Sequence, residues 1–333
     1  MDAKLIIRDI QLKKIAPIYL LHGDEPYYID EISKALLEHI LTEEERAFNQ
    51  LIVYGKEADA SLLISELNSF PVMATKRLVI IKEAQDFKSI DNLAGYCERP
   101  LDSTIFVICY KYGTLDARKK IVKGILKNGV VFKSSKIKDY KLVDWITHAV
   151  KSKGFTISSK AAVLLAEFLG NDLSKINNEL DKLGILLEPG TSINDVHIEK
   201  NIGVSKDYNV YELNNAVANK ELEKAFKIIQ YFEYNPKAAR LTQVVSTLFR
   251  HFTQIMRIHF LPNKSKESVA QYLKVHPYIA GELLKSAMLY SPQKIAKTIE
   301  VLYEYDLKGK GVGSSNVEPS ELMKELVFKI VQQ

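Results

Sequence analysis

Gly23 follows an apolar segment that predicts a buried strand, and a helical pattern covers residues 31–41 shortly afterwards. A strand, a glycine turn and a helix form the setting in which the motif G-x-x-x-x-G-K-[ST] binds nucleotide phosphates. Counted from Gly23, the positions of the second glycine, the lysine and the Ser/Thr hold Tyr28, Ile29 and Asp30. Tyr28 would block the approach of the backbone, Ile29 supplies no charge, and Asp30 would repel phosphate. The segment has the outline of a phosphate-binding loop without the side chains that its chemistry requires.

Two other positions that an ATPase needs also hold unexpected residues. An apolar strand followed by Asp-Glu would supply the Mg²⁺ ligand, but residues 78–81 are followed by Lys82 and Glu83. The next apolar strand, residues 105–110, ends without a polar residue that could orient an attacking water. The seven histidines show neither H-E-x-x-H spacing nor a G-x-S-x-G partner, and His22 is interpreted as structural rather than as a base. We therefore predict no catalytic residue, no cofactor site and no metal site.

A second candidate site is the connection between a helix predicted at 60–67 and a strand predicted at 77–82. Phe70, Val72 and Met73 are clustered apolar residues in a segment where polar residues are expected. Either these side chains cover the core of the domain, or they form an exposed anchor for a partner protein. The residue types alone leave both interpretations open.

The composition is typical of a folded protein with two or three domains, since the chain has 333 residues, 47% of them hydrophobic and 26% charged. Its longest apolar runs are shorter than the ~20 residues that span a bilayer. Arg8 and Asp9 interrupt the apolar N-terminal stretch, which therefore does not resemble a signal peptide. The two cysteines, Cys97 and Cys109, are too few for a disulfide scaffold and predict buried thiols in a reducing cytoplasm.

The net charge of +5 is unevenly distributed along the chain. Residues 206–333 contain 18 Lys/Arg against 13 Asp/Glu and carry the whole excess. Residues 111–138 contain nine basic residues against Asp116 alone. Such a run is either a solvated face or a surface that contacts nucleic acid.

The order of the patterns predicts three domains. Residues 1–138 alternate apolar strands with helices, which predicts an α/β domain with a parallel sheet covered on both faces. Residues 139–205 show helical patterns and end in a linker at 203–207, and residues 206–333 are again helical, with a glycine-rich break at 309–316. The predicted strands are 17–21, 49–54, 77–82, 104–110 and 130–133. The predicted helices are 31–41, 60–67, 89–98, 115–128, 141–153, 158–169, 172–187, 192–201, 239–260, 266–272, 278–288, 293–307 and 320–331.

Four segments together resemble the delta subunit of the bacterial DNA polymerase III clamp loader. They are residues 17–31 (PIYLLHGDEPYYIDE), 69–83 (SFPVMATKRLVIIKE), 170–183 (GNDLSKINNELDKL) and 209–220 (NVYELNNAVANK). The resemblance runs in the right order through most of the chain and includes the degenerate loop at Gly23. It implies an N-terminal AAA+-like α/β domain, a helical lid domain and an all-helical C-terminal collar domain, in agreement with the three regions above.

The resemblance also implies a function and a binding segment. Subunits of this family bind no ATP, but grip the ring-shaped sliding clamp and open one of its interfaces. The grip uses a pair of apolar residues followed by a small residue and basic residues, a position matched here by Val72 and Met73. Phe70 and Pro71 complete the predicted clamp-binding segment, residues 70–73. Val72 is smaller than the usual residue, so Phe70 is an alternative source of contact area.

The implied protein is a non-catalytic part of the DNA polymerase III holoenzyme in the cytoplasm. Its implied partners are the sliding clamp, the loader ATPase subunits through the collar domain, and primed DNA, without a cofactor or a membrane. The candidate DNA contacts are Lys119, Lys120 and Lys123. One alternative is an active P-loop-type NTPase or nucleotide kinase with an atypical loop, which the missing lysine at Ile29 disfavours. Another is a free-standing DNA-binding protein, which the mild overall charge disfavours.

Overall fold

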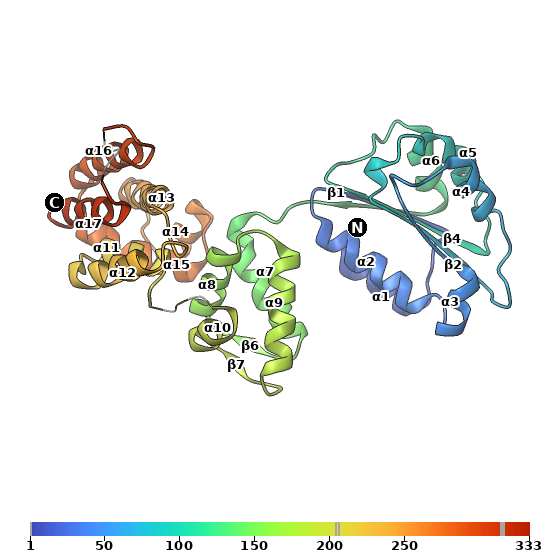
Figure 1. Cartoon of the computed structure of the whole chain (residues 1–333), viewed down its shortest axis with the longest axis horizontal. Coiled ribbons are helices and arrows are strands. Elements are labelled where there is room, and N and C mark those ends of the chain that lie inside the picture. Colours follow the sequence, from blue (N-terminus) through green and yellow to red (C-terminus); the bar gives the residue numbers. More distant parts are fainter. Residues whose placement is uncertain (1, 204, 206, 314–316) are drawn as a thin grey trace. The chain divides into compact units, whose positions relative to one another are not determined.

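The computed structural model of the chain describes residues 2–203, 205, 207–313 and 317–333. Its backbone contacts divide the chain into two compact units, Met1–Ile137 and Lys138–Gln333. The first unit is α/β and the second is built mainly of helices (Figure 1). Residues 204 and 206 of the predicted linker, and residues 314–316 of the predicted break, lie outside the described residues. The predicted separation of residues 139–205 from residues 206–333 stays a prediction.

A five-stranded parallel sheet forms the centre of the first unit, with the strand order β2-β3-β4-β1-β5. Its strands are β1 (Ile18–Gly23), β2 (Gln50–Tyr54), β3 (Arg77–Lys82), β4 (Thr104–Lys111) and β5 (Val130–Ser134). Successive side chains of β1 enter opposite cores: Ile18 and Leu20 belong to one, and Tyr19 and Leu21 to the other. Burial on both faces explains the near-continuous apolar strands and confirms the predicted parallel sheet.

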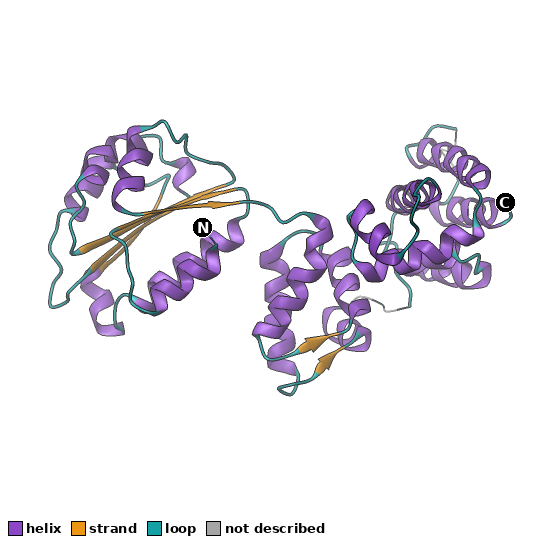
Figure 2. Ribbon diagram, turned by 180° about the vertical axis from the view of Figure 1, so that it is seen from behind, coloured by secondary structure: helices purple, strands orange, loops and turns teal. Residues whose placement is uncertain are grey.

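Helices cover both faces of this sheet (Figure 2). The core on one face contains residues of α1 and α2, and the core on the other contains residues of α4, α5 and α6. The helices are α1 (Ala3–Gln11), α2 (Pro26–His39), α3 (Glu43–Asn49), α4 (Ala60–Leu67), α5 (Ala94–Glu98) and α6 (Lys120–Asn128), with two 3-10 helices, η1 (Ala84–Asp86) and η2 (Ile90–Leu93). The prediction did not include α1 and α3.

Helix α5 begins at Ala94 rather than at residue 89, since Ile90–Leu93 form the 3-10 helix η2, and two other helices of this unit also begin at other residues than predicted. Helix α2 begins at Pro26, because the Glu25 side chain accepts a hydrogen bond from the Tyr27 N–H at 3.2 Å and proline is favoured in a first turn. Helix α6 begins at Lys120 rather than at residue 115, since the buried Leu115 belongs to the loop before the helix. Apolar spacing alone identified both helices but not their starts.

The second unit contains eleven α-helices and two short strands among its described residues. They are α7 (Leu142–Ser152), α8 (Ser159–Leu169), α9 (Leu173–Leu186), α10 (Asp195–Ile202), α11 (Val210–Ala218), α12 (Leu222–Tyr234), α13 (Leu241–His259), α14 (Lys266–Leu273), α15 (Pro277–Leu289), α16 (Pro292–Gly309) and α17 (Pro319–Val331), preceded by the 3-10 helix η3 (Asp139–Lys141). Helices α11 to α17 share one hydrophobic core, in which α13 buries one apolar face. All elements from α11 onward are helical in the described residues, as predicted.

The prediction that strands end with the first domain was wrong. Strands β6 (Thr156–Ile157) and β7 (Ser192–Ile193) form a short parallel pair. Two-residue strands have no detectable alternation, so the sequence pattern could not show them. The helix predicted at 192–201 therefore begins later, after Asn194, whose side chain accepts a hydrogen bond from the His197 N–H at 3.1 Å.

Candidate functional site

The turn after β1 is too short for a phosphate-binding loop. Only Asp24 and Glu25 separate the end of β1 from the start of α2. The residues that the motif count places at the phosphate, Tyr28, Ile29 and Asp30, therefore lie inside α2. Ile29 is fully buried in the core between α2 and the sheet. The position that would hold the phosphate-binding lysine points into the core, which explains why an apolar residue occupies it.

Gly23 has a different role from the glycine of a phosphate loop. Its φ is +138°, and a Cβ on it would lie 1.9 Å from the carbonyl oxygen of Ser134 in β5. The Asp24 N–H donates to that carbonyl oxygen at 3.2 Å, and the Ser134 hydroxyl donates to the carbonyl oxygen of Glu25 at 2.6 Å. The glycine thus allows a close approach of two backbone segments, and the turn is tied to β5.

An ion-pair network occupies the edge of the sheet where a doubly wound fold would bind nucleotide. Lys111 ends β4, and its Nζ lies 3.0 Å from Asp30 Oδ1 and 2.8 Å from Glu83 Oε1. Burial opposes the charge of Lys111, but its hydrogen bonds to Glu83 and Asp30 outweigh burial and raise its pKa. Burial likewise opposes the charge of Glu83, but bonds from Lys111 and Gln85 outweigh it and lower the pKa of Glu83. The network joins α2 to the ends of β3 and β4.

We expect Lys111→Met to lower the free energy of unfolding of the first unit, because Asp30 and Glu83 lose the cation that they share. The loss should be only about 1–2 kcal/mol, since both carboxylates are partly exposed and water compensates them in part. The pKa of Glu83 is depressed, so its stabilisation is complete above its ordinary value of 4.5 and is lost as pH falls through the lowered pKa. The deficit of the variant should therefore shrink below about pH 4.

Urea unfolding followed by circular dichroism, at neutral and at acidic pH, measures this deficit. Lys88→Met is the control, since Lys88 is exposed and forms no ion pair in the described part of the chain, whereas the charge of Lys82 also lowers the pKa of Glu83. A deficit of the same size at both pH values would show that the variant loses packing contacts of the Lys111 side chain rather than its ion pairs.

The predicted clamp-binding segment is exposed. The side chains of Phe70, Val72 and Met73 are 76%, 49% and 99% exposed. The interpretation that they cover the core is therefore wrong, and the sequence instead presents three apolar side chains to solvent between α4 and β3. Met73 has φ +52°, a left-handed conformation that costs a residue other than glycine about 1 kcal/mol or more. Pro71 restricts the backbone just before this turn.

The end of α3 lies against the same segment. Asn49, the last residue of α3, is fully buried and hydrogen-bonds both backbone polar groups of Val72. Its neighbour in the chain, Phe48, is also an apolar residue and is 69% exposed. The prediction assigned Asn49 to the start of a strand and gave Phe48 no role. The contact of Asn49 with Val72 has no signal in the local sequence, because α3 and the segment are far apart along the chain.

The candidate DNA contacts lie at the start of α6. Lys119 precedes the helix, and its Nζ is 2.9 Å from Asp91 Oδ2, while Lys120 and Lys123 are exposed in the first turns. The Asp91 carboxylate raises the pKa of Lys119. Cations at a helix N-terminus oppose the helix dipole, so this group of charges does not contribute to the stability of α6.

Other chemistry-bearing residues have structural roles. His22 is buried and its Nδ1 accepts a hydrogen bond from the Leu115 N–H at 3.1 Å; burial, then Lys133, lowers its pKa, as expected for a structural histidine. Cys97 and Cys109 form no disulfide, and burial raises the pKa of each to about 12.

Across the described ranges, no group of three or more His, Cys, Asp or Glu could hold a metal ion. None of the helices described is both long and apolar enough to cross a membrane.

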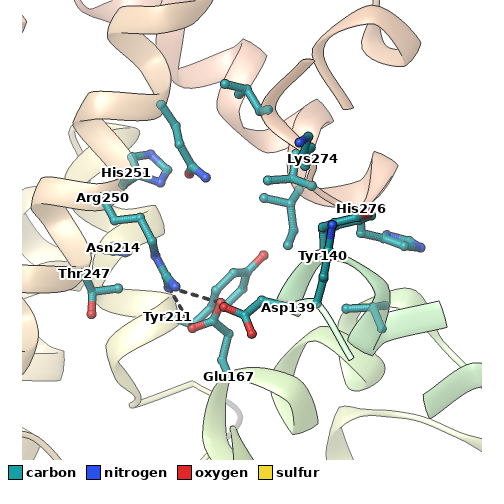
Figure 3. A pocket seen from close by; sticks show the side chains of 16 residues that line it. Asp139, Tyr140, Glu167, Tyr211, Asn214, Thr247, Arg250, His251, Lys274 and His276 are labelled. Carbon is teal, nitrogen blue, oxygen red and sulfur yellow. Dashed lines mark hydrogen bonds and ion pairs between the residues drawn. The ribbon is translucent and has the colours of Figure 1, made fainter. Parts of the chain in front are cut away.

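A cavity of about 450 Å³ lies within the helical unit (Figure 3). Arg250 of α13 donates to both carboxylate oxygens of Glu167 of α8, at 3.0 and 3.3 Å. Burial lowers the pKa of His251 to about 4, so its imidazole is neutral at physiological pH. Asp139 and Lys274 also line the cavity. Because acidic and basic side chains are mixed around it, the cavity favours neither an anion nor a cation.

Comparisons with known proteins define the family. Residues 19–135 match the family model "DNA polymerase III, delta subunit", and residues 207–330 match "DNA polymerase III delta subunit, C-terminal domain". The chain belongs to the DNA polymerase III delta subunit family. Together the two matches span well over half of the chain, and they include both the turn at Gly23 and the exposed segment.

Two relatives of the delta family extend this match over nearly the whole chain. The DNA polymerase III subunit delta of Bacillus subtilis (strain 168) is 24% identical over 314 residues, which cover 90% of each protein. The solved structure of the Bacillus subtilis DNA clamp loader delta protein is 21% identical, covers 100% of both chains and has a TM-score of 0.55. The structural likeness confirms the predicted fold, an AAA+-like α/β domain followed by a helical part that includes the C-terminal domain.

Proposed function

We propose that this chain is the clamp-loader subunit that binds a DNA sliding clamp and opens it for loading onto primed DNA during replication. The observation that carries the proposal is the exposed apolar segment at residues 70–73, in a member of the delta family. Met73 presents almost its whole side chain to solvent and Phe70 three quarters of it. Apolar side chains of this kind are anchors at protein interfaces.

Opening requires that the chain bind the open clamp more tightly than the closed one. The binding energy of the segment can then favour the open ring without any chemistry in this chain. Partner subunits that bind and hydrolyse ATP would control when the segment reaches the clamp. The chain itself has a non-catalytic role in this scheme.

The alternative, an active P-loop-type NTPase, is disfavoured by the geometry of the turn after β1. Ile29 lies in the core, and Lys111 pairs with Asp30 and Glu83 where a nucleotide would bind. The two carboxylates balance the positive charge of Lys111 and occupy its hydrogen-bond donors, so it is poorly placed to bind phosphate. The membership of the delta family points in the same direction.

Two further parts of the proposal concern the other partners. We assign assembly with the loader ATPases to the C-terminal helical domain, which has its own core and exposes Phe249, Phe260 and Tyr303. We assign contact with the phosphates of primed DNA to Lys120 and Lys123, with Lys119 partly engaged by Asp91. The buried thiols fit the cytoplasmic location that a replication protein requires.

We expect the isolated chain not to bind Mg-ATP. Titration of the full-length protein with a fluorescent ATP analogue and Mg²⁺ should give no saturable signal. The double variant Asp30→Ala/Glu83→Ala serves as the comparison, because it removes the two carboxylates that form ion pairs with Lys111. Saturable binding at about micromolar concentrations by the unaltered chain, reduced by substitutions in the turn at Gly23, would support the NTPase alternative.

A further inference from the structure

Asn49 makes an unusual set of hydrogen bonds to the segment at residues 70–73. Its Oδ1 accepts from the Val72 N–H at 2.7 Å, and its Nδ2 donates to the Val72 carbonyl oxygen at 2.8 Å. The same Nδ2 donates to the Glu45 carbonyl oxygen at 3.0 Å, within α3. A side-chain amide carries a donor and an acceptor side by side, so it can pair with both polar groups of one backbone residue. Asn49 therefore holds Val72 as a neighbouring strand would.

The helix that carries Asn49 is itself fixed. Arg77, the first residue of β3, donates from Nη1 to the carbonyl oxygen of Phe48 at 3.2 Å and forms an ion pair with Glu66 of α4. The end of α3 is thus connected to both elements that flank the segment. The Asn49 side chain is fully buried, so its amide is shielded from water and its hydrogen bonds restrain the segment.

The exposed side chains of the segment need such a restraint. Phe70 and Met73 make little contact with the rest of the unit, since they are 76% and 99% exposed. A segment held only by its ends would sample many conformations and would lose that freedom on binding a partner. Fixing the backbone at Val72 sets the direction of the side chains on both sides of it before the partner arrives.

We infer that Asn49 is a positioning residue for the clamp: its buried amide holds the Val72 backbone so that the apolar segment is preorganised for binding. This inference rests on the proposed function, since it concerns the same contact with the clamp. Asn49 does not touch the clamp in this account and acts through the segment.

The test measures the affinity of the full-length chain for its cognate sliding clamp by surface plasmon resonance. Asn49→Ala should weaken binding about tenfold, because the freed segment must be ordered on association. Asn68→Ala is the matched control: Asn68 directly follows α4 in the same connection, and among the described residues its side-chain amide donates to the carbonyl oxygen of Ile64 in that helix, at 2.8 Å, and does not contact the segment. The control should bind like the unaltered chain.

A double-mutant cycle with Met73→Ser separates positioning from a general effect on folding. If Asn49 acts through the segment, Asn49→Ala should cost much less affinity once Met73 has been replaced. Hydrogen exchange gives an independent readout: the Val72 amide should exchange faster in Asn49→Ala while the amides of β3 keep their protection.

Asn49→Asp covers the case in which the alanine variant does not fold. Aspartate keeps the size of asparagine and the acceptor for the Val72 N–H, but it lacks the amide donors, so it should also weaken binding. If both Asn49 variants bind the clamp as tightly as the unaltered chain, the inference is overturned but the proposed function is not. The same holds if Asn49→Ala costs as much affinity in the Met73→Ser background as in the unaltered chain. Unfolding of both variants would also overturn it, because Asn49 would then be a core residue. Failure of the unaltered chain to bind the clamp would instead refute the proposed function.

Discussion

Replacing Val72 and Met73 together with serine should weaken binding of the sliding clamp by about a hundredfold. Full burial of an apolar side chain of this size is worth roughly 1.5–3 kcal/mol. Met73 is 99% exposed and can bury its whole side chain in a pocket of the clamp, whereas Val72 is 49% exposed and can contribute about half as much. The sum is about 3 kcal/mol, and ~1.4 kcal/mol is a factor of ten in affinity.

Surface plasmon resonance with immobilised clamp measures this loss, with circular dichroism as the folding control. The variant should fold normally, because neither side chain belongs to a core. Leu126→Ser on α6 is the matched control, since Leu126 is a 58% exposed apolar residue elsewhere on the same unit. Phe70→Ser, measured separately, shows how much of the contact Phe70 provides. Unchanged affinity of the double variant would place the anchor in another part of the chain.

The isolated first unit, Met1–Ile137, should keep the clamp affinity of the full chain within about threefold and lose assembly into the loader. Both cores of its sheet are formed by residues within this unit, so it is expected to fold alone. The segment at residues 70–73 and its Asn49 contact are retained. The C-terminal helical core, to which we assign assembly, is absent from the fragment.

Size-exclusion chromatography tests both halves of this prediction. The fragment is mixed with the clamp in one experiment and with the loader ATPase subunits in another, and the full-length chain is the reference in each. A folded fragment that no longer binds the clamp would show that the helical unit contributes to clamp binding. Incorporation of the fragment into the loader would contradict the assignment of assembly to the C-terminal domain.

The fold was predictable where apolar spacing and end signals agree. Helix Ala60–Leu67 and strand Arg77–Lys82 have the predicted bounds. The Asp59 side chain caps this helix by accepting from the Leu62 N–H at 2.9 Å, which gives it a sharp start. The start of α2 was missed because its signals, Glu25 and Pro26, are polar and turn-forming residues that lie outside the apolar stripe.

The site was only partly predictable. The residue types of the segment pointed to an apolar cluster, but exposure depends on packing, which local sequence does not determine. The bond between Asn49 and Val72 joins residues 23 positions apart, and an asparagine before a strand has no feature that indicates such a contact. The pairing of Lys111 with Asp30 and Glu83 was equally hidden, although the unsuitability of Asp30 for phosphate was evident from its charge.

Clamp opening by this chain in the absence of nucleotide is the most direct test of the central claim. The cognate clamp can carry a dye pair across one subunit interface that is quenched when the ring is closed. Adding the full-length chain should raise the fluorescence to a saturating level, and the variant with serine at positions 72 and 73 should leave it low at the same concentrations. Unchanged fluorescence when the clamp is saturated with the unaltered chain would contradict the account.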